Sequence, residues 1–433
     1  MFAERRERLL ASIGEGALLI TAARERTRNG DVDYEFRQDS SFYYLTGFEE
    51  PDAVALLRPG HDEPYVLFVR PHDPDQAVWV GPRVGVEGAV ERFGASAAFP
   101  IDELRERLPA LLGGVETVYF ALGADDPLER MLGEIVQRRR QGAQRGPVAI
   151  ARVADPTPHI DRLRLLKSDA EIAELQRAID VTGGGMEAAM RATHAGLHEY
   201  EVQAVMEAEF RRLGAIRNGF PSIVASGPHA CTLHYTQNRR RLEPGDLLLL
   251  DVGAEWGYYS ADVTRTYPVD GAFTPEQRAV YDIVLEAQAR GIATAGPGVP
   301  FHDVHDAALR VLVEGLIGLE VITGSVDEAI ETHSYRPYYM HSTSHWLGLD
   351  VHDVGAYRVG EVSVPLTPGM VLTVEPGLYL NPDVGPVPDA LRNVGVRIED
   401  DVLITPEGRR VLSGAIPSDP AALEAIVGRR RID

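Results

Sequence analysis

Short apolar runs alternate with amphipathic segments through the first 140 residues of the chain. Residues 2–13 form an amphipathic, charged segment that predicts a helix, and the apolar run at 17–22 predicts a strand. A second strand is predicted at 65–70, a helix at 102–112 and a third strand at 117–122. Such alternation is typical of a layered arrangement of helices and strands. The pattern therefore predicts an N-terminal α/β domain over residues 1–140.

Turn-forming residues then gather in one stretch and predict a linker at residues 141–167. This turn-rich stretch begins at Gln137 and includes Gly142, Gly146, Pro147, Pro156 and Pro158. The division leaves residues 168–433 for a second domain, and a chain of 433 residues is indeed too long for one ordinary core.

Two helix starts can be recognised in the second part. Ser168 and Glu171 have the spacing of a capping box, which predicts the beginning of a long helix. Thr274 and Gln277 repeat that spacing, with Pro275 at the first helical position. The segments between and after these helices are rich in β-forming residues. The fold class predicted for the whole chain is therefore α/β (α+β).

Composition excludes several classes of partner. The formal net charge of −22 would repel the phosphates of nucleic acids and of anionic membranes. The basic runs Arg239–Arg241 and Arg429–Arg431 are interpreted as a solvated turn and a solvated end. We expect no transmembrane helix, because no apolar run reaches about 18 residues. We expect no secretory signal, because the charged segment at 2–13 has no apolar core.

Five residues in the second domain form a candidate metal-ligand set, and each lies beside a glycine, a proline or a β-rich run. Four carboxylates and one imidazole are hard, oxygen-rich ligands, which suit Mn(II) first and also Co, Fe or Zn. Without metal, four converging carboxylates would repel one another, so two divalent ions are predicted. An isolated acidic residue at a strand end could equally be a solvated turn residue, but this interpretation suits the whole set poorly. The five residues are Asp251, Asp262, His345, Glu375 and Glu399.

Four segments around these residues resemble a known metallopeptidase core. They read LLLLDVGAEWGYYSADVTRTYPV, MHSTSHWLGLDVHDVG, VLTVEPGLY and VRIEDDVLIT. The core is shared by aminopeptidase P, prolidase and methionine aminopeptidase, and its pita-bread fold has two α/β halves around a dinuclear site. The bacterial aminopeptidase P family is the most similar, since the resemblance also includes the segment FRQDSSFYYLTGF at 36–48. The resemblance implies an N-terminal aminopeptidase P-type domain and a C-terminal pita-bread domain.

The resemblance also implies a role for individual side chains. It places His345 rather than His341 on metal, and it leaves His341 as a pocket residue near the substrate. His234 and His352 match two active-site imidazoles that would hydrogen-bond the substrate carbonyl. The alternative for each is a core histidine that a backbone group satisfies. The other histidines are interpreted in that way.

Three further groups complete the predicted chemistry. Glu375, besides binding metal, would act as general base and then as proton donor to the leaving nitrogen. Arg397, two residues before Glu399 on a strand, would hold the metal carboxylates ionised and oriented. Tyr379 is a weaker candidate for substrate binding and would lie behind these groups. The single lysine, Lys167, has neither the setting for a Schiff base nor that for a phosphate loop.

The single cysteine, Cys231, excludes internal disulfides and predicts a reducing, cytoplasmic compartment. A nucleophilic pair of Cys231 with His234 is disfavoured, because the metal site already supplies a nucleophile.

The predicted function is hydrolysis of the N-terminal Xaa-Pro bond of peptides with proline at the second position. The alternatives are a prolidase, which cleaves only dipeptides, and a non-catalytic pita-bread module, which would have lost metal ligands. The family also implies a homo-oligomer, either a dimer or a tetramer. One departure from the family concerns Pro156 and Thr157, where the bacterial relatives have a bulkier Trp-Arg pair. It weakens any inference about substrate length from that pair.

Overall fold

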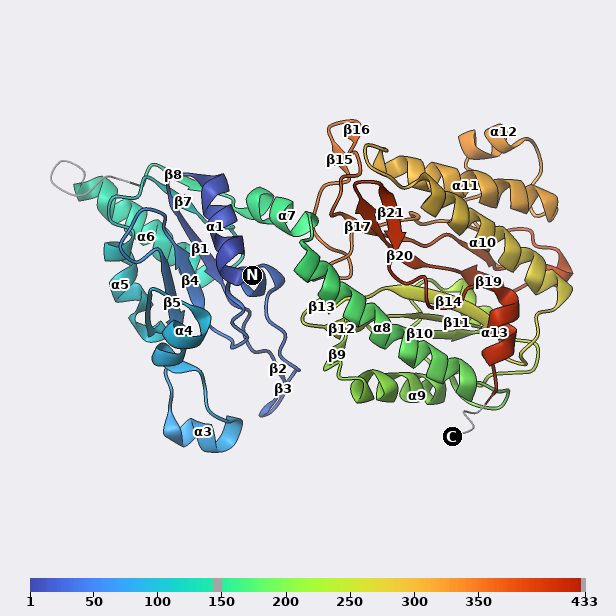
Figure 1. Ribbon diagram of the computed structural model, residues 1–433, viewed down its shortest axis with the longest axis horizontal. Helices are drawn as coiled ribbons and strands as arrows, with labels where there is room; N and C mark the ends of the chain where they lie inside the picture. The colour runs from blue at the N-terminus through green and yellow to red at the C-terminus, as the bar shows by residue number, and fades with distance from the viewer. Residues whose placement is uncertain (143–149, 430–433) are drawn as a thin grey trace. The chain divides into compact units, whose positions relative to one another are not determined.

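The computed structural model describes residues 1–142 and 150–429 and divides the chain into two compact units. The first unit is Met1–Arg164 and the second begins at Leu165. Figure 1 shows both units, each built from helices and strands. None of the helices in the described residues is long and apolar enough to cross a membrane.

The first unit is built around one mixed sheet. Among its described residues, six strands follow the order β6-β5-β4-β1-β7-β8. The pairs β1/β4 and β4/β5 are antiparallel, whereas β1/β7, β5/β6 and β7/β8 are parallel. The sheet strands are β1 (Ala17–Thr21), β4 (Val54–Leu57), β5 (Tyr65–Val69), β6 (Ala97–Pro100), β7 (Thr117–Tyr119) and β8 (Arg152–Ala154); a separate hairpin joins β2 (Thr27–Asn29) and β3 (Val32–Asp33).

Helices supply the rest of the core of this unit. Leu104 and Leu108 pack with the buried strand residues Leu19, Leu56 and Val66 in one apolar cluster. The helices are α1 (Phe2–Ile13), α2 (Ser40–Thr46), α3 (Pro74–Val80), α4 (Gly85–Phe93), η1 (Ile101–Glu103), α5 (Leu104–Leu111), α6 (Asp126–Gly142) and α7 (Thr157–Leu165).

The structure confirms the predicted alternation of helices and strands in this unit and corrects part of the turn-rich stretch. Turns were predicted from Gln137, but residues 137–142 continue α6, because glutamine and arginine are good helix formers. The predicted linker, 141–167, contains β8 and α7, whereas Gly146 and Pro147 lie outside the described residues.

The second unit has several short sheets. In its described residues the orders are β10-β11-β14, β13-β12-β9 and β17-β20-β21, with the pairs β18/β19 and β15/β16. Strand β11 is buried along its whole length, as its continuous apolar run predicts. The strands are β9 (Arg217–Asn218), β10 (Ile223–Ser226), β11 (Leu247–Val252), β12 (Ala254–Trp256), β13 (Tyr259–Ser260), β14 (Val263–Pro268), β15 (Arg358–Val359), β16 (Val362–Ser363), β17 (Val371–Val374), β18 (Gly377–Leu380), β19 (Val394–Arg397), β20 (Asp400–Thr405) and β21 (Gly408–Val411).

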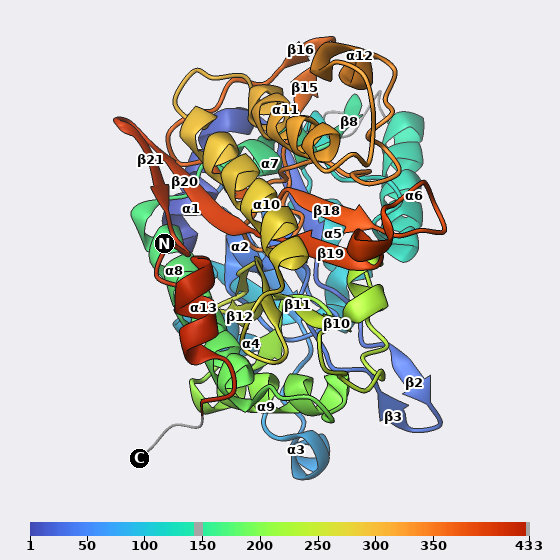
Figure 2. The same ribbon diagram turned by 90° about the vertical axis from the view of Figure 1, so that its right-hand side faces the viewer.

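Two pairs of helices pack around these strands, as Figures 1 and 2 show. The pair α8 and α9 lies on one side, and the pair α10 and α11 lies on the other. The helices are α8 (Asp169–Ala192), α9 (Glu199–Arg212), η2 (Gly227–Cys231), α10 (Pro275–Thr294), α11 (Phe301–Gly318), α12 (Val326–Glu331), η3 (Asp389–Leu391) and α13 (Pro420–Ile426).

Both predicted capping boxes are confirmed. Ser168 and Glu171 cap α8, and Thr274 and Gln277 cap α10. These caps satisfy backbone N–H groups that have no partner within the helix. They fix where each helix begins, and therefore how it approaches the strands.

Candidate active site

Breaks between strands position the acidic residues that the sequence singles out. Asp262 lies between β13 and β14, Glu375 between β17 and β18, and Glu399 between β19 and β20. At such a break the chain leaves one sheet and enters another, so a side chain there is free of the strict alternation of a strand. Asp251 lies within β11 and pairs with Thr264 of β14.

Thr264 also links strands β11 and β14 to Glu399. Its carbonyl accepts a hydrogen bond from the backbone N–H of Glu399, at 3.1 Å. Its hydroxyl donates to Oε2 of Glu399 at 2.6 Å. Residues that lie more than 130 positions apart in the sequence are thereby brought to one point.

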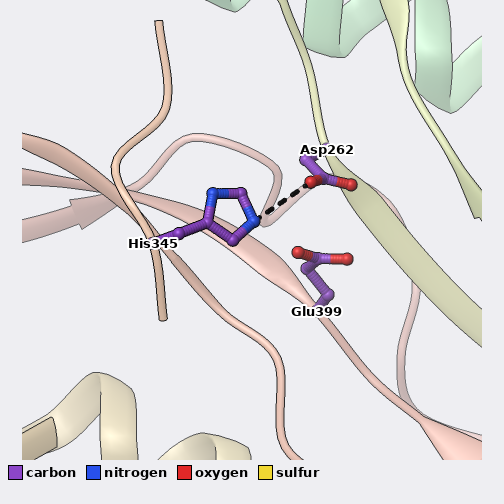
Figure 3. A group of neighbouring side chains, drawn as sticks. All are labelled: Asp262, His345 and Glu399. Carbon is purple, nitrogen blue, oxygen red and sulfur yellow. Dashed lines mark ion pairs between the residues drawn. The ribbon is translucent and has the colours of Figure 1, made fainter. Parts of the chain in front are cut away.

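His345 presents its Nε2 atom to this group of carboxylates. Its Nδ1 lies 3.0 Å from the carbonyl of Trp346, which fixes the proton on Nδ1 and leaves the lone pair on Nε2. Nε2 is 3.4 Å from Oδ2 of Asp262 and 3.4 Å from Oε1 of Glu375. Figure 3 shows His345, Asp262 and Glu399 pointing toward one another, and one ligand atom of each lies within 4.8 Å of the others.

The electrostatics of this group fit divalent cations. Burial, together with the charge of Asp251, raises the pKa of Asp262 well above its usual range. Burial likewise raises the pKa of Glu375 to about 7 and that of Glu399 well above its usual range. Oδ1 of Asp262 and Oε1 of Glu399 are buried without a hydrogen-bond partner among the described residues. Buried carboxylate oxygens are normally paired, so the residues fit divalent metal ions.

Arg397 is buried beside the carboxylates and its guanidinium is largely occupied. It donates to Oδ2 of Asp251 at 2.5 Å and to the hydroxyl of Tyr379 at 2.9 Å. A longer contact of 3.3 Å joins its Nε to Thr264. This arrangement holds Asp251 in one orientation, as an arginine beside a ligand carboxylate is expected to do.

The hydrogen bonds around His341 can be assigned a direction. Its Nδ1 lies 2.8 Å from the carbonyl of Ser342 and therefore carries the proton. Its Nε2, 2.8 Å from the hydroxyl of Tyr379, must then accept. Burial lowers the pKa of His341 to about 3, which agrees with a neutral ring. Arg397, Tyr379 and His341 thus form a directed chain, and the His341 ring is fixed in place with both nitrogens engaged.

One cavity of about 750 Å³ in the second unit collects most of the predicted residues. It is lined by all five predicted metal ligands, by Arg397 and by His234, His341 and His352. Tyr379 does not line it and lies behind His341. The remaining lining residues include Phe220, Pro221, Ile223, Leu233, Phe301, Val351 and Tyr357.

A buried carboxylate, Glu199, organises the segment that carries His234. It lies at the first position of α9, and its oxygens accept from the hydroxyls of Ser226 and Tyr235 at 2.7 and 2.8 Å. The backbone N–H of Arg240 also donates to it, at 2.8 Å. The sequence analysis did not identify Glu199. Its position one residue after His198, in a third capping box, is the only local signal.

Comparison with known proteins identifies the family. The sequence model of metallopeptidase family M24 matches residues 173–406, and that of the aminopeptidase P N-terminal domain matches residues 2–119. The chain belongs to metallopeptidase family M24. Membership supports the use of divalent metal by the carboxylate group described above.

The similarity to other family members extends over nearly the full chain. The Xaa-Pro aminopeptidase of Escherichia coli K12 is 41% identical, over 98% of this chain and 97% of the relative. The structure of Pseudomonas aeruginosa aminopeptidase PepP is 42% identical, with a TM-score of 0.95, and covers 98% of this chain and 97% of that one. Zinc-substituted E. coli aminopeptidase P in complex with product is 41% identical, with a TM-score of 0.94 and the same coverage. These matches confirm the predicted resemblance and the predicted fold class, an N-terminal α/β domain followed by a pita-bread metallopeptidase domain.

Proposed function

We propose that this protein is an Xaa-Pro aminopeptidase, which releases the N-terminal residue from peptides with proline at the second position. The observation that supports it most is the cavity, where four carboxylates, Arg397 and five histidines meet; four of these histidines were predicted and the fifth is His302. Relatives that share this chain from end to end are named for the same activity. A non-catalytic module is disfavoured, because the chain keeps every predicted metal ligand.

We propose two divalent ions held by Asp251, Asp262, His345, Glu375 and Glu399, with Mn²⁺ as the first candidate and Zn²⁺ or Co²⁺ as alternatives. Four carboxylates and one imidazole are ligands that suit these ions. Such ions, when bound, acidify a water molecule and polarise a carbonyl group. Zinc can be substituted into one relative, E. coli aminopeptidase P.

Glu375 is proposed to move the proton. A carboxylate that lines the cavity, as Glu375 does, can accept the proton of an attacking water at one of its oxygens. It can then deliver that proton to the proline nitrogen, which must be protonated to leave as an amine. Thr373 donates a long hydrogen bond of 3.4 Å to Oε1 of Glu375, so that Oε2 is the freer oxygen for this transfer.

His234 and His352 are proposed to hydrogen-bond the scissile carbonyl. Both line the cavity, and burial together with the neighbouring histidines lowers the pKa of His352. A neutral imidazole can donate from one nitrogen to an oxygen on which negative charge develops. In contrast, both nitrogens of His341 are engaged, so we propose that its ring, held by Tyr379, forms a wall for the proline ring.

Arg397 bears on the choice between an aminopeptidase and a prolidase. A prolidase must bind the free carboxylate of the proline and requires a cation for it. Among the described residues that line the cavity, Arg397 is the only arginine or lysine. It already binds Asp251 and Tyr379. This favours a substrate that continues beyond the proline.

The substrate length can be tested directly. The Mn²⁺-loaded enzyme should release one residue from Xaa-Pro-Yaa tripeptides and longer peptides. The matched Xaa-Ala-Yaa peptides should be cleaved at least about tenfold more slowly, a discrimination within reach of a shaped pocket. Released amino acid and remaining peptide are measured by mass spectrometry. Activity confined to Xaa-Pro dipeptides would instead identify a prolidase.

We also propose that the chain forms a homo-oligomer, a dimer or a tetramer. Three consecutive apolar residues on the short helix α3 support it, since Val78, Trp79 and Val80 are 83%, 86% and 67% exposed. Exposed apolar clusters of this kind are typical of association surfaces. Light scattering after gel filtration should give two or four times the mass of the chain, and a monomer at micromolar concentration would contradict the proposal.

Two further assignments stay predictions. The cytoplasmic location rests on the single Cys231 and on the reducing compartment that it suggests. The division into residues 1–140, 141–167 and 168–433 rests on the turn-rich stretch of the sequence.

A further inference from the structure

The single lysine of the chain lies in a buried ion pair next to the cavity. Nζ of Lys167 is 2.9 Å from Oδ2 of Asp353, and each side chain is only 1% exposed. Arginine carries every other positive side-chain charge apart from the histidines. Lys167 precedes the cap of α8, and its backbone N–H donates to the carbonyl of Gly369 at 2.8 Å. Lys167 is therefore held both at its backbone N–H and at its ammonium group.

Asp353 belongs to the loop that carries His352. The loop follows Trp346 and ends near Gly355, and the backbone N–H of Asp353 donates to the carbonyl of Trp346 at 2.9 Å. A second internal bond, 3.2 Å long, runs from the N–H of Gly348 to the carbonyl of Asp350. The loop is thus closed on itself, and the ion pair ties it to the segment before α8.

The imidazole of His352 has no hydrogen bond of its own to any described residue. Its ring packs edge-on against that of His345, with 4.4 Å between the ring centroids. Since no hydrogen bond fixes the side chain, the position of the ring depends on the backbone that carries it. The nearest anchored side chain of that backbone is Asp353, the next residue.

We propose that Lys167 is a positioning residue, which holds His352 in the cavity through its ion pair with Asp353. This inference rests on the proposed function, in which His352 hydrogen-bonds the scissile carbonyl. Stability alone is a weak explanation for the pair, because a buried ion pair can often be replaced by apolar residues of similar size without loss of stability. The position of an imidazole relative to a carbonyl, in contrast, must be accurate to within a fraction of an ångström.

The space around the pair explains why lysine stands there in an arginine-rich chain. A Cβ atom built on Gly348 would lie 2.1 Å from Oδ2 of Asp353 and 2.9 Å from Cε of Lys167. The pair therefore occupies the volume that a larger residue would need. An ammonium group is compact, whereas a guanidinium is broad and planar, so arginine should not replace lysine here.

A double variant tests the tether by removing both charges of the ion pair together. K167M/D353L replaces both partners with apolar side chains. Its kcat on an Xaa-Pro-Yaa peptide should fall at least about tenfold, with KM changed less than about threefold, because an oxyanion donor acts mainly on kcat. A crystal structure of this variant should show the His352 ring displaced. R58M, which removes a largely buried arginine from the first unit, is the matched control and should keep wild-type kcat.

Comparison with H352A separates positioning from a general effect on the fold. If Lys167 acts through His352, adding K167M/D353L to H352A should lower kcat by no more than about twofold further. Metal content and circular dichroism should match those of the wild type in all variants. The inference is overturned if K167M/D353L keeps wild-type kcat, if its effect is fully additive with H352A, or if it loses metal.

Two further outcomes are also decisive. K167R should behave like K167M/D353L, and wild-type kcat in K167R would show that the ammonium geometry is not needed. If the wild-type enzyme does not cleave Xaa-Pro-Yaa peptides at all, the proposed function fails rather than the tether. In that case the crystal structure of K167M/D353L alone decides whether the ion pair positions His352.

Discussion

Replacement of Glu375 by glutamine should lower kcat on Xaa-Pro-Yaa peptides by about 10²–10⁴-fold, the usual contribution of a general base. Glutamine keeps the shape of the side chain, but its amide can neither accept the proton of the attacking water nor deliver one to the proline nitrogen. The loss should exceed that of any substitution outside the ligand set. Steady-state kinetics on the Mn²⁺-loaded variant measure it.

The same variant should keep part of its metal, because Asp251, Asp262, His345 and Glu399 remain. Metal content by mass spectrometry separates the loss of the base from the loss of the ions. Glu314→Gln, which removes an exposed carboxylate from α11, is the control and should be unaffected. A Glu375→Gln enzyme with more than about a tenth of wild-type kcat would exclude the proposed proton transfer.

The second large effect concerns the metal itself. Dialysis against a chelator should abolish hydrolysis, and Mn²⁺ should restore it. The metal-free protein should also melt at a lower temperature, because ions that bind only the folded state stabilise it by mass action. In the absence of metal the buried carboxyls Asp262 and Glu399 have raised pKa values, since burial and mutual repulsion oppose their charge. Differential scanning calorimetry with and without Mn²⁺ measures the change in melting temperature.

Asp262→Ala gives the complementary test. It removes a carboxylate whose Oδ1 atom has no hydrogen-bond partner among the described residues. It leaves the apolar core untouched. We expect an inactive protein that folds but whose melting temperature no longer rises when Mn²⁺ is added. Full activity in rigorously metal-free wild-type protein would rule out the metal-dependent mechanism.

Local sequence patterns determined much of the fold. Helix α1 and the caps of α8 and α10 follow the prediction, because amphipathic spacing and capping boxes act over a few residues. The buried strand β11 follows from its continuous apolar run. The prediction failed at residues 137–142, where the glycine at the end suggested a turn but the preceding residues favour a helix. The sequence predicts helix or turn reliably only where neighbouring residues favour the same conformation.

The sequence also named the charged and histidine residues that line the cavity, except His302, because the motifs around the predicted ligands are long and specific. It could not show how these residues are oriented. Three properties belong to the folded chain: the proton on Nδ1 of His345, the direction of the hydrogen bonds from Arg397 through Tyr379 to His341, and the absence of another arginine or lysine among the described residues that line the cavity. Each depends on partners that are distant in the sequence.

Lys167 shows the difference most clearly. As a sequence position it is one lysine before a capping box, without a motif for any lysine chemistry. In the folded chain it meets Asp353, 186 residues later, in a space that the absent side chain of Gly348 leaves open. Short-range patterns determined where these helices begin and which residues are candidates for metal chemistry. Only tertiary packing decided which buried charges meet, because an ion pair between distant residues leaves no periodic pattern in either segment.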